Sequence, residues 1–122
     1  MRFLKSKYEP ATQMNSPIKR IDWQNDTAIV YAEGEIDLHI SPQFQTDLKK
    51  VIEQKPAKMV VNLSQVPYMD SSGVAALVKL LSKTRSENIK LVIENPSSKV
   101  MSIFEITKLT SVFDIKSDSN TN

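Results

Sequence analysis

The hydrophobic residues of this chain follow two alternating patterns. Short apolar runs occupy residues 18–23, 27–33, 59–63 and 89–94, and turn-forming residues bound them. Runs of this length, several of them rich in β-branched residues, predict β-strands. After the second, third and fourth runs, apolar residues recur every three or four positions, which predicts amphipathic helices. Only residues 24–26 separate the first two strands, so we expect these strands to pair antiparallel.

The three predicted helices each begin at a sequence typical of helix starts. Ser41 is the expected N-cap of the first helix with Pro42 at its first position, the segment 70–73 precedes the second helix, and Ser97 caps the third. The residues expected to face the core are Phe44, Leu48, Val51 and Ile52 in the first helix, Val74, Leu77, Val78 and Leu81 in the second, and Val100, Ile103, Phe104 and Thr107 in the third.

The order of elements is β-β-α-β-α-β-α, followed by a weak strand or turn at 112–115. Strand–helix–strand units of this length give right-handed crossovers and a largely parallel sheet, to which the first pair adds an antiparallel strand. We therefore predict a single α/β domain with a mixed sheet, since 122 residues supply one hydrophobic core but not two. We expect the domain to span residues 17–116, between a flexible N-terminal extension at 1–16 and a disordered polar tail at 117–122.

Composition argues against several classes of function. A net charge of +2, with no cluster of Lys and Arg among aromatic residues, disfavours direct binding of nucleic acid. Without Cys, and with His39 as the single histidine, no thiolate or multi-histidine metal site is expected, and the lack of Cys fits a cytoplasmic protein. No apolar run reaches the length of a membrane span, and no signal peptide is recognised. Two glycines cannot form a glycine-rich nucleotide loop, so we expect no cofactor.

The segment Asp70-Ser71-Ser72-Gly73 is the strongest candidate for function. It follows a buried strand and opens an amphipathic helix, so its hydroxyls lie at a helix N-terminus, where backbone N–H groups are unpaired and the dipole favours an anion. One serine could be a phosphoacceptor, or Asp70 or Ser71 could simply cap the helix. Gly73 within the first turn costs roughly 1 kcal/mol relative to alanine, which indicates a sharp turn or a close approach to the backbone.

Three further features allow a functional or a purely structural interpretation. Glu35 and Asp37, in the segment 34–37, could form part of a binding edge or a solvated loop. Tyr68 and Met69 could be exposed anchors for a partner or half-buried packing residues. A serine hydrolase is disfavoured, because neither Ser71 nor Ser72 has glycines two residues before and after it, as the nucleophile elbow requires. His39 would have to be the base of such an enzyme, and a loop position is the simpler interpretation.

Two of these pieces together resemble a known family. Gly34-Glu35-Ile36-Asp37 and Met69-Asp70-Ser71-Ser72-Gly73, separated by a helix and a strand, resemble the STAS domain family, and specifically its anti-sigma factor antagonists. The segment 103–109 resembles the third helix of that family. The resemblance covers residues 17–116. It implies a mixed four- to five-stranded sheet with helices packed mainly on one side.

The resemblance implies a regulatory switch rather than an enzyme. The unphosphorylated protein would bind an anti-sigma factor that is also an ATP-binding serine kinase, which would release the sigma factor. Phosphorylation of Ser71 would abolish binding, and a metal-dependent serine phosphatase would restore it. Asp70, Ser72 and Gly73 would support the turn. The docking surface for this partner would be framed by Gly34, Glu35, Asp37, Tyr68 and Met69.

Two alternatives remain open within the same resemblance. The domain could be an accessory subunit of a lipid or solute ABC transporter, or a signalling scaffold without a phospho-switch. The chain also departs from the family pattern in three places: Val74-Ala75-Ala76 follows Gly73 where many relatives have Leu-Gly, the N-terminal extension is longer than usual, and the isoelectric point near 8.8 is more basic than expected.

Overall fold

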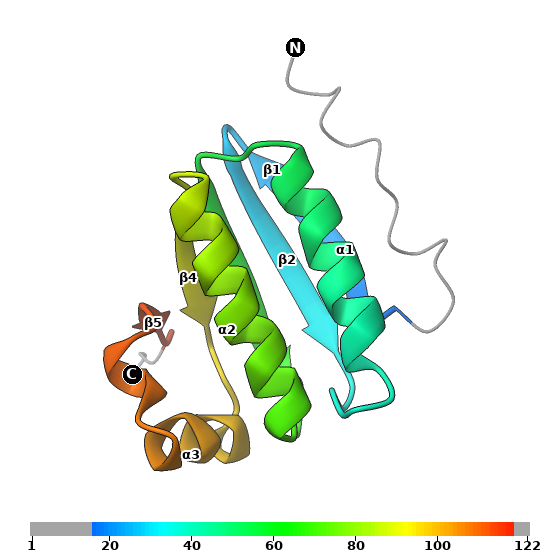
Figure 1. Ribbon diagram of the computed structural model, residues 1–122, viewed down its shortest axis with the longest axis vertical. Coiled ribbons are helices and arrows are strands. Elements are labelled where there is room, and N and C mark those ends of the chain that lie inside the picture. Colours follow the sequence, from blue (N-terminus) through cyan, green and yellow to red (C-terminus); the bar gives the residue numbers. More distant parts are fainter. Residues whose placement is uncertain (1–15, 119–122) are drawn as a thin grey trace.

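A computed structural model describes residues 16–118, so most of the predicted extension and tail lie outside the described residues. Strands and helices alternate along this region as the hydrophobic pattern predicts (Figure 1). The elements in chain order are β1 (Ile18–Gln24), β2 (Thr27–Glu33), α1 (Ser41–Glu53), β3 (Lys58–Gln65), α2 (Ser71–Ser86), β4 (Lys90–Glu94), α3 (Ser98–Ile106), the 3-10 helix η3 (Leu109–Ser111) and β5 (Ile115–Lys116).

The strands form one five-stranded mixed sheet in the order β1-β2-β3-β4-β5. β1 pairs antiparallel with β2, and every other pairing is parallel, which confirms the predicted arrangement. The last strand has only two residues, and its Ile115 lies opposite Ile93 of β4. Because β2, β3 and β4 run parallel, their carboxyl ends lie at the same end of the sheet.

The helices α1 and α2 lie side by side over one face of the sheet, and α3 lies near the end of the sheet where β4 finishes (Figure 1). The core forms between this helical pair and the sheet. Its sheet residues include Ala28, Val30, Met59, Val61, Leu63, Leu91 and Ile93, and its helix residues include Phe44, Leu48, Val51, Leu77 and Leu80. The prediction of helices mainly on one side is therefore confirmed.

The predicted core face is correct for α1 and partly wrong for the other two helices. All four predicted residues of α1 are buried. In α2, however, Val78 is 40% exposed, whereas Ala76 and Leu80 are buried. The neighbouring α1 covers one flank of α2, so the buried stripe is rotated toward it and leaves Val78 outside. Thr107 is exposed just beyond α3, where its hydroxyl donates to the Ile103 carbonyl.

The start of α1 differs from the expectation of a serine cap. Ile40 is the N-cap residue, Ser41 is the first helical residue, and no side chain in the described part of the chain caps the helix directly. The preceding turn is instead closed by Asp37, whose Oδ1 accepts from the backbone N–H groups of His39 and Ile40. An aspartate whose side chain accepts a hydrogen bond from the backbone two residues further on is a typical turn former. The turn that Asp37 forms makes Ile40 the N-cap in place of the predicted Ser41. Ser97 does cap α3, by accepting from the Val100 N–H.

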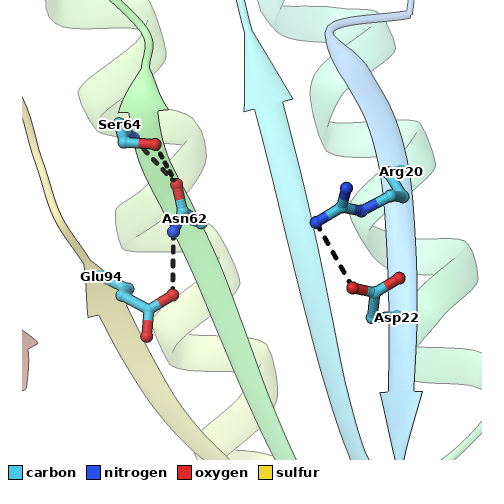
Figure 2. A network of polar contacts seen from close by, with 5 residues as sticks. All are labelled: Arg20, Asp22, Asn62, Ser64 and Glu94. Atoms are coloured by element: carbon cyan, nitrogen blue, oxygen red, sulfur yellow. Dashed lines mark hydrogen bonds and ion pairs between the residues drawn. The ribbon is translucent and has the colours of Figure 1, made fainter.

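The opposite face of the sheet carries polar side chains that pair with one another (Figure 2). Asn62 of β3 donates to Glu94 of β4 at 2.8 Å and accepts from Ser64. On β1, Arg20 lies 3.4 Å from Asp22 and also covers the Tyr31 ring. Asn62 is buried, so these hydrogen bonds satisfy an amide that burial would otherwise leave unpaired. The Arg20–Asp22 pair is exposed, and such pairs contribute about 0–1 kcal/mol each.

A buried polar contact joins α1 to the segment that precedes β1. Asp47 has no exposed surface, although it lies on a helix packed against the core. Its carboxylate accepts hydrogen bonds from the Ser16 hydroxyl and from the Gln43 side-chain amide. Ser16 also accepts from the Ile18 N–H, so it links the first strand to α1. A buried carboxylate needs such donors because desolvation without them is costly.

We expect Ser16→Ala to lower the free energy of unfolding by about 1–3 kcal/mol, because Asp47 would keep its burial and lose a donor. Urea denaturation of the full chain measures this change. The matched control is Ser86→Ala, which removes an exposed hydroxyl that donates to the Lys83 carbonyl, and which should change stability by less than about 0.5 kcal/mol. Equal effects of the two substitutions would show that the Ser16–Asp47 contact does not stabilise the domain.

Candidate functional site

The two segments that the sequence singles out meet at the carboxyl end of the parallel strands. Ile36 and Met69 form an isolated parallel bridge. The Ile36 N–H donates to the Tyr68 carbonyl at 3.0 Å, and the Asp70 N–H donates to the Ile36 carbonyl at 3.2 Å. The loop after β2 and the loop after β3 are thereby fixed side by side, directly before α2 begins.

The Asp70 side chain connects these two loops to the helix. Its Oδ1 accepts from the backbone N–H groups of Ser72, at 2.9 Å, and of Gly73, at 3.3 Å. The same oxygen accepts from the Ser72 hydroxyl at 2.5 Å. Its Oδ2 accepts from the Leu38 N–H at 3.1 Å, across 32 residues of sequence. Asp70 is therefore the N-cap of α2 and also the anchor of the 34–40 loop.

These donors stabilise the ionised form of the Asp70 carboxyl. The hydroxyl of Ser72 has the largest effect, and the backbone N–H groups of Ser72, Gly73 and Leu38 add to it, so the pKa of Asp70 lies below its ordinary value despite partial desolvation. The carboxylate already occupies the N–H groups at the start of α2. An anion on a neighbouring residue would therefore find these donors taken, which differs from the favourable helix terminus that the sequence suggests.

The two serines of the turn have different surroundings. Ser72 is partly buried, and its hydroxyl is held by Asp70. Ser71 is the exposed first residue of α2, and within the part of the chain that the structure describes its hydroxyl has no hydrogen-bond partner. Among residues 16–118 no side chain is thus placed as a base for Ser71, and a nucleophilic serine would need one. The local chemistry instead leaves Ser71 available to an incoming reagent.

Gly73 is buried, and its lack of a side chain allows the 34–40 loop to approach α2. A Cβ atom at this position would lie 2.8 Å from the Ile36 carbonyl oxygen and 2.9 Å from Met69 Cβ. The close approach that the glycine indicated is therefore made by this chain's own loop. Gly73 lies beneath that loop, so the close approach serves packing within the domain.

The residues predicted to contact a partner divide into a surface group and a buried group. Tyr68 is 43% exposed, Glu35 is exposed, and Gly34 adopts a positive φ at the end of β2. Met69, in contrast, has no exposed surface, so it packs beneath the turn and cannot serve as an exposed anchor. Asp37 is partly buried because its carboxylate closes the turn before α1.

Sequence reasoning missed Leu38, which lies between Asp37 and His39 and is 73% exposed. Its backbone N–H donates to Asp70, so the side chain is held at the surface beside the turn at residues 70–73. A single leucine in a polar loop has no periodicity that would reveal it. Leu38 is exposed next to the loop that carries Tyr68, so this end of the molecule has apolar surface. The carboxylates of Glu35, Asp37 and Asp70 lie at the same end.

Among residues 16–118, no group of three or more His, Cys, Asp or Glu side chains could hold a metal ion. Within the same range no helix has both the length and the apolar character needed to cross a membrane.

Comparison with known proteins identifies similar sequences and folds. The STAS domain family matches residues 19–122. The anti-sigma-B factor antagonist of Bacillus subtilis is 32% identical over 96 residues, which cover 79% of this chain and 86% of that protein. An anti-sigma factor antagonist from Mycobacterium paratuberculosis has a similar structure, with a TM-score of 0.75 and 20% identity, covering 85% of this chain and 88% of that one. The phosphorylated form of SpoIIAA from Bacillus gives a TM-score of 0.63 at 19% identity, covering 84% and 94%.

We expect Gly73→Ala to destabilise the domain by about 1–3 kcal/mol, since the added methyl group must displace the Ile36 backbone. Helix propensity alone predicts a gain of about 1 kcal/mol, so the two explanations differ in sign. Chemical denaturation of the full chain measures the change. The control is Ala75→Gly at an exposed position of the same helix, which should cost about 1 kcal/mol. A more stable Gly73→Ala protein would show that the loop is not held against the helix.

Acid should remove the stabilisation that Asp70 provides. The pKa of Asp70 is lower in the folded chain than in the unfolded one, so the unfolded chain binds more protons as the pH falls. The stabilisation by Asp70 is therefore lost as the pH falls through the ordinary aspartate pKa of about 3.9 and below it. The stability difference between the wild type and Asp70→Asn should be constant near neutral pH and shrink below about pH 4. The exposed-site variant Glu53→Gln controls for loss of one charge. A difference that grew in acid would contradict this assignment.

Proposed function

The chain belongs to the STAS domain family, and we propose that it is an anti-sigma factor antagonist whose binding is controlled by phosphorylation of Ser71. The observation that carries this proposal is the contrast between the two serines. Ser72 is bonded to Asp70, whereas Ser71 is exposed beside it with no hydrogen-bond partner for its hydroxyl among the described residues. A kinase must reach the hydroxyl of its substrate, and Ser71 is the more exposed of the two serines and the one whose hydroxyl is not held by Asp70.

Asp70, Ser72 and Gly73 support this presentation without taking part in the transfer. Asp70 caps α2 and keeps the Ser72 hydroxyl engaged, so α2 begins at a fixed place and Ser71 projects from its first turn. Gly73 lets the 34–40 loop lie against the helix. These three residues act as positioning residues, and the chain itself is the substrate of another protein's chemistry rather than an enzyme.

The docking surface that we propose surrounds Ser71. Leu38 and Tyr68 supply exposed apolar area, and Glu35 and Gly34 border it in the loop after β2. A few residues carry most of the binding energy of an interface, and tyrosine is enriched among them, so we expect Tyr68 to contribute more than Leu38. Met69 and Asp37 contribute indirectly, by packing under the turn and by closing the loop. The expected partner is an anti-sigma factor, as the name of the Bacillus subtilis relative suggests.

Phosphate on Ser71 would switch this surface off through charge and bulk. It adds about −1.5 to −2 charges beside the Asp70 carboxylate, at a surface that also includes Glu35. Because Asp70 already occupies the N–H groups of Ser72 and Gly73, the phosphate would extend outward, into the space that a partner would fill. A loss of about 3 kcal/mol in binding would lower affinity more than a hundredfold.

The partners required by this cycle are a serine kinase, which we expect to be the ATP-binding anti-sigma factor itself, and a serine phosphatase that restores the hydroxyl. The fold likeness to SpoIIAA in its phosphorylated form supports a phosphorylated state for a domain of this shape. The relative's name and the exposed hydroxyl together favour this role over a transporter accessory subunit, which would not require Ser71 to be accessible.

We expect an anti-sigma factor kinase encoded near this chain's gene, supplied with ATP, to phosphorylate Ser71. Peptide mapping by mass spectrometry should find phosphate on Ser71 in the wild type and in Ser72→Ala, and none in Ser71→Ala. The two alanine variants are a matched pair, since each removes one hydroxyl from the same turn. Phosphate on Ser72, or modification that persists in Ser71→Ala, would contradict the assignment. No modification of either serine would favour the accessory or scaffold role.

Binding should follow the charge at position 71 without a change in fold. Ser71→Asp should bind the anti-sigma factor at least a hundredfold more weakly than Ser71→Ala, as measured by calorimetry. Both variants should melt within a few degrees of the wild type, because the side chain of Ser71 is exposed and unbonded. If Ser71→Asp unfolded, its loss of binding would result from instability, and the surface-repulsion mechanism would be wrong.

A further inference from the structure

A groove of about 370 Å³ lies between α1 and α2. Its apolar lining comes from Leu48 and Ile52 of α1 and from Ala76 and Leu80 of α2. These four side chains pack the two helices together and are almost fully buried, so they offer little apolar area to a ligand. The groove spans about two helical turns on each side, which is the length of a short helical segment.

Basic side chains border this groove on both helices. Lys49 comes from α1, and Lys79 and Lys83 come from α2. All three are exposed, and none of the described residues that line the groove is acidic. Lys83 lies 3.6 Å from Glu87, while Lys49 and Lys79 have no ion pair with any residue in the described range. The groove therefore presents positive charge that its own residues only partly neutralise.

The helix dipole does not account for all of this charge. A lysine in the last turn of a helix is stabilised by the negative C-terminal end, which explains Lys83. Lys79 and Lys49 lie outside the last turns of their helices, where the dipole has little effect. Lys79 and Lys83 are also four residues apart on one helix, a like-charge arrangement that costs a few tenths of a kcal/mol.

We propose that this groove binds an acidic helix of a protein partner. Charge complementarity supports an anionic ligand, because the border of the groove carries one sign of charge from both sides. The concave shape between two helices fits a third helix, whose carboxylates can reach lysines on both borders. A flat bilayer surface would meet the lysine tips without entering the groove. Since little apolar area is available, binding should be moderate and sensitive to salt.

The groove is separate from the proposed switch. Lys79 and Lys83 lie 8 and 12 residues beyond Ser71 on α2, or roughly 12 and 18 Å along the helix axis. These distances exceed the Debye length of about 8 Å at physiological ionic strength. A charge at Ser71 should therefore leave binding in the groove nearly unchanged, so the two sites can be tested independently.

The test is a titration of the ¹⁵N-labelled full chain, followed by NMR, with a synthetic alanine-rich helical peptide that carries glutamates along one face. We expect shifts of amide signals along the groove-facing sides of α1 and α2. The double variant Lys49→Glu/Lys79→Glu should weaken binding at least tenfold. The charge-matched control Lys19→Glu/Lys58→Glu, at β1 and β3 positions away from the groove, should bind as the wild type does.

Several results would overturn the proposal. These are equal weakening in both double variants, equal binding of a peptide whose glutamates are replaced by lysines, and shifts confined to other surfaces. Binding of phosphatidylglycerol vesicles without binding of the acidic peptide would assign the charge to a membrane surface instead. Ser71→Asp should retain peptide affinity within twofold. Its effect on the anti-sigma factor is measured separately, so failure of one site can be distinguished from failure of the other.

Discussion

The Asp70 carboxylate is the contact on which the arrangement of this site depends. One oxygen holds the first turn of α2 and the Ser72 hydroxyl, and the other holds the loop that follows β2. The parallel sheet makes this possible, because it brings the carboxyl ends of β2 and β3 together. Without the carboxylate, the N–H groups of Leu38 and of the helix start would lose their common acceptor.

Charge is distributed unevenly over the molecule, and this gives it two chemically different surfaces. Carboxylates and exposed apolar side chains gather where Ser71 is presented, whereas lysines border the groove between α1 and α2. On the other face of the sheet, polar side chains of neighbouring strands pair with each other, as Asn62 does with Glu94 (Figure 2). The phosphate that we propose on Ser71 would therefore add to negative charge already present at that surface, and the acidic partner that we propose would bind at the other.

The fold could be predicted from the sequence because its signals are local and agree with each other. The strand-forming run at 27–33 matches β2 residue for residue, and the periodic residues of α1 are all buried. Where prediction failed, a contact distant in sequence or a competing local signal decided. The neighbouring helix α1 rotated the buried stripe of α2 away from Val78, and Asp37 rather than Ser41 closed the turn before α1.

The sequence by itself determined the order of the elements, the single domain and the position of the Asp-Ser-Ser-Gly turn, because periodicity, turn residues and spacing act over a few residues. The tertiary structure decided which residues of that turn meet solvent. It engaged Ser72, left Ser71 exposed, buried Met69, and brought Leu38 to Asp70 across 32 residues. Hydrogen bonds and burial between distant segments depend on how the chain packs in three dimensions, and no local pattern records them.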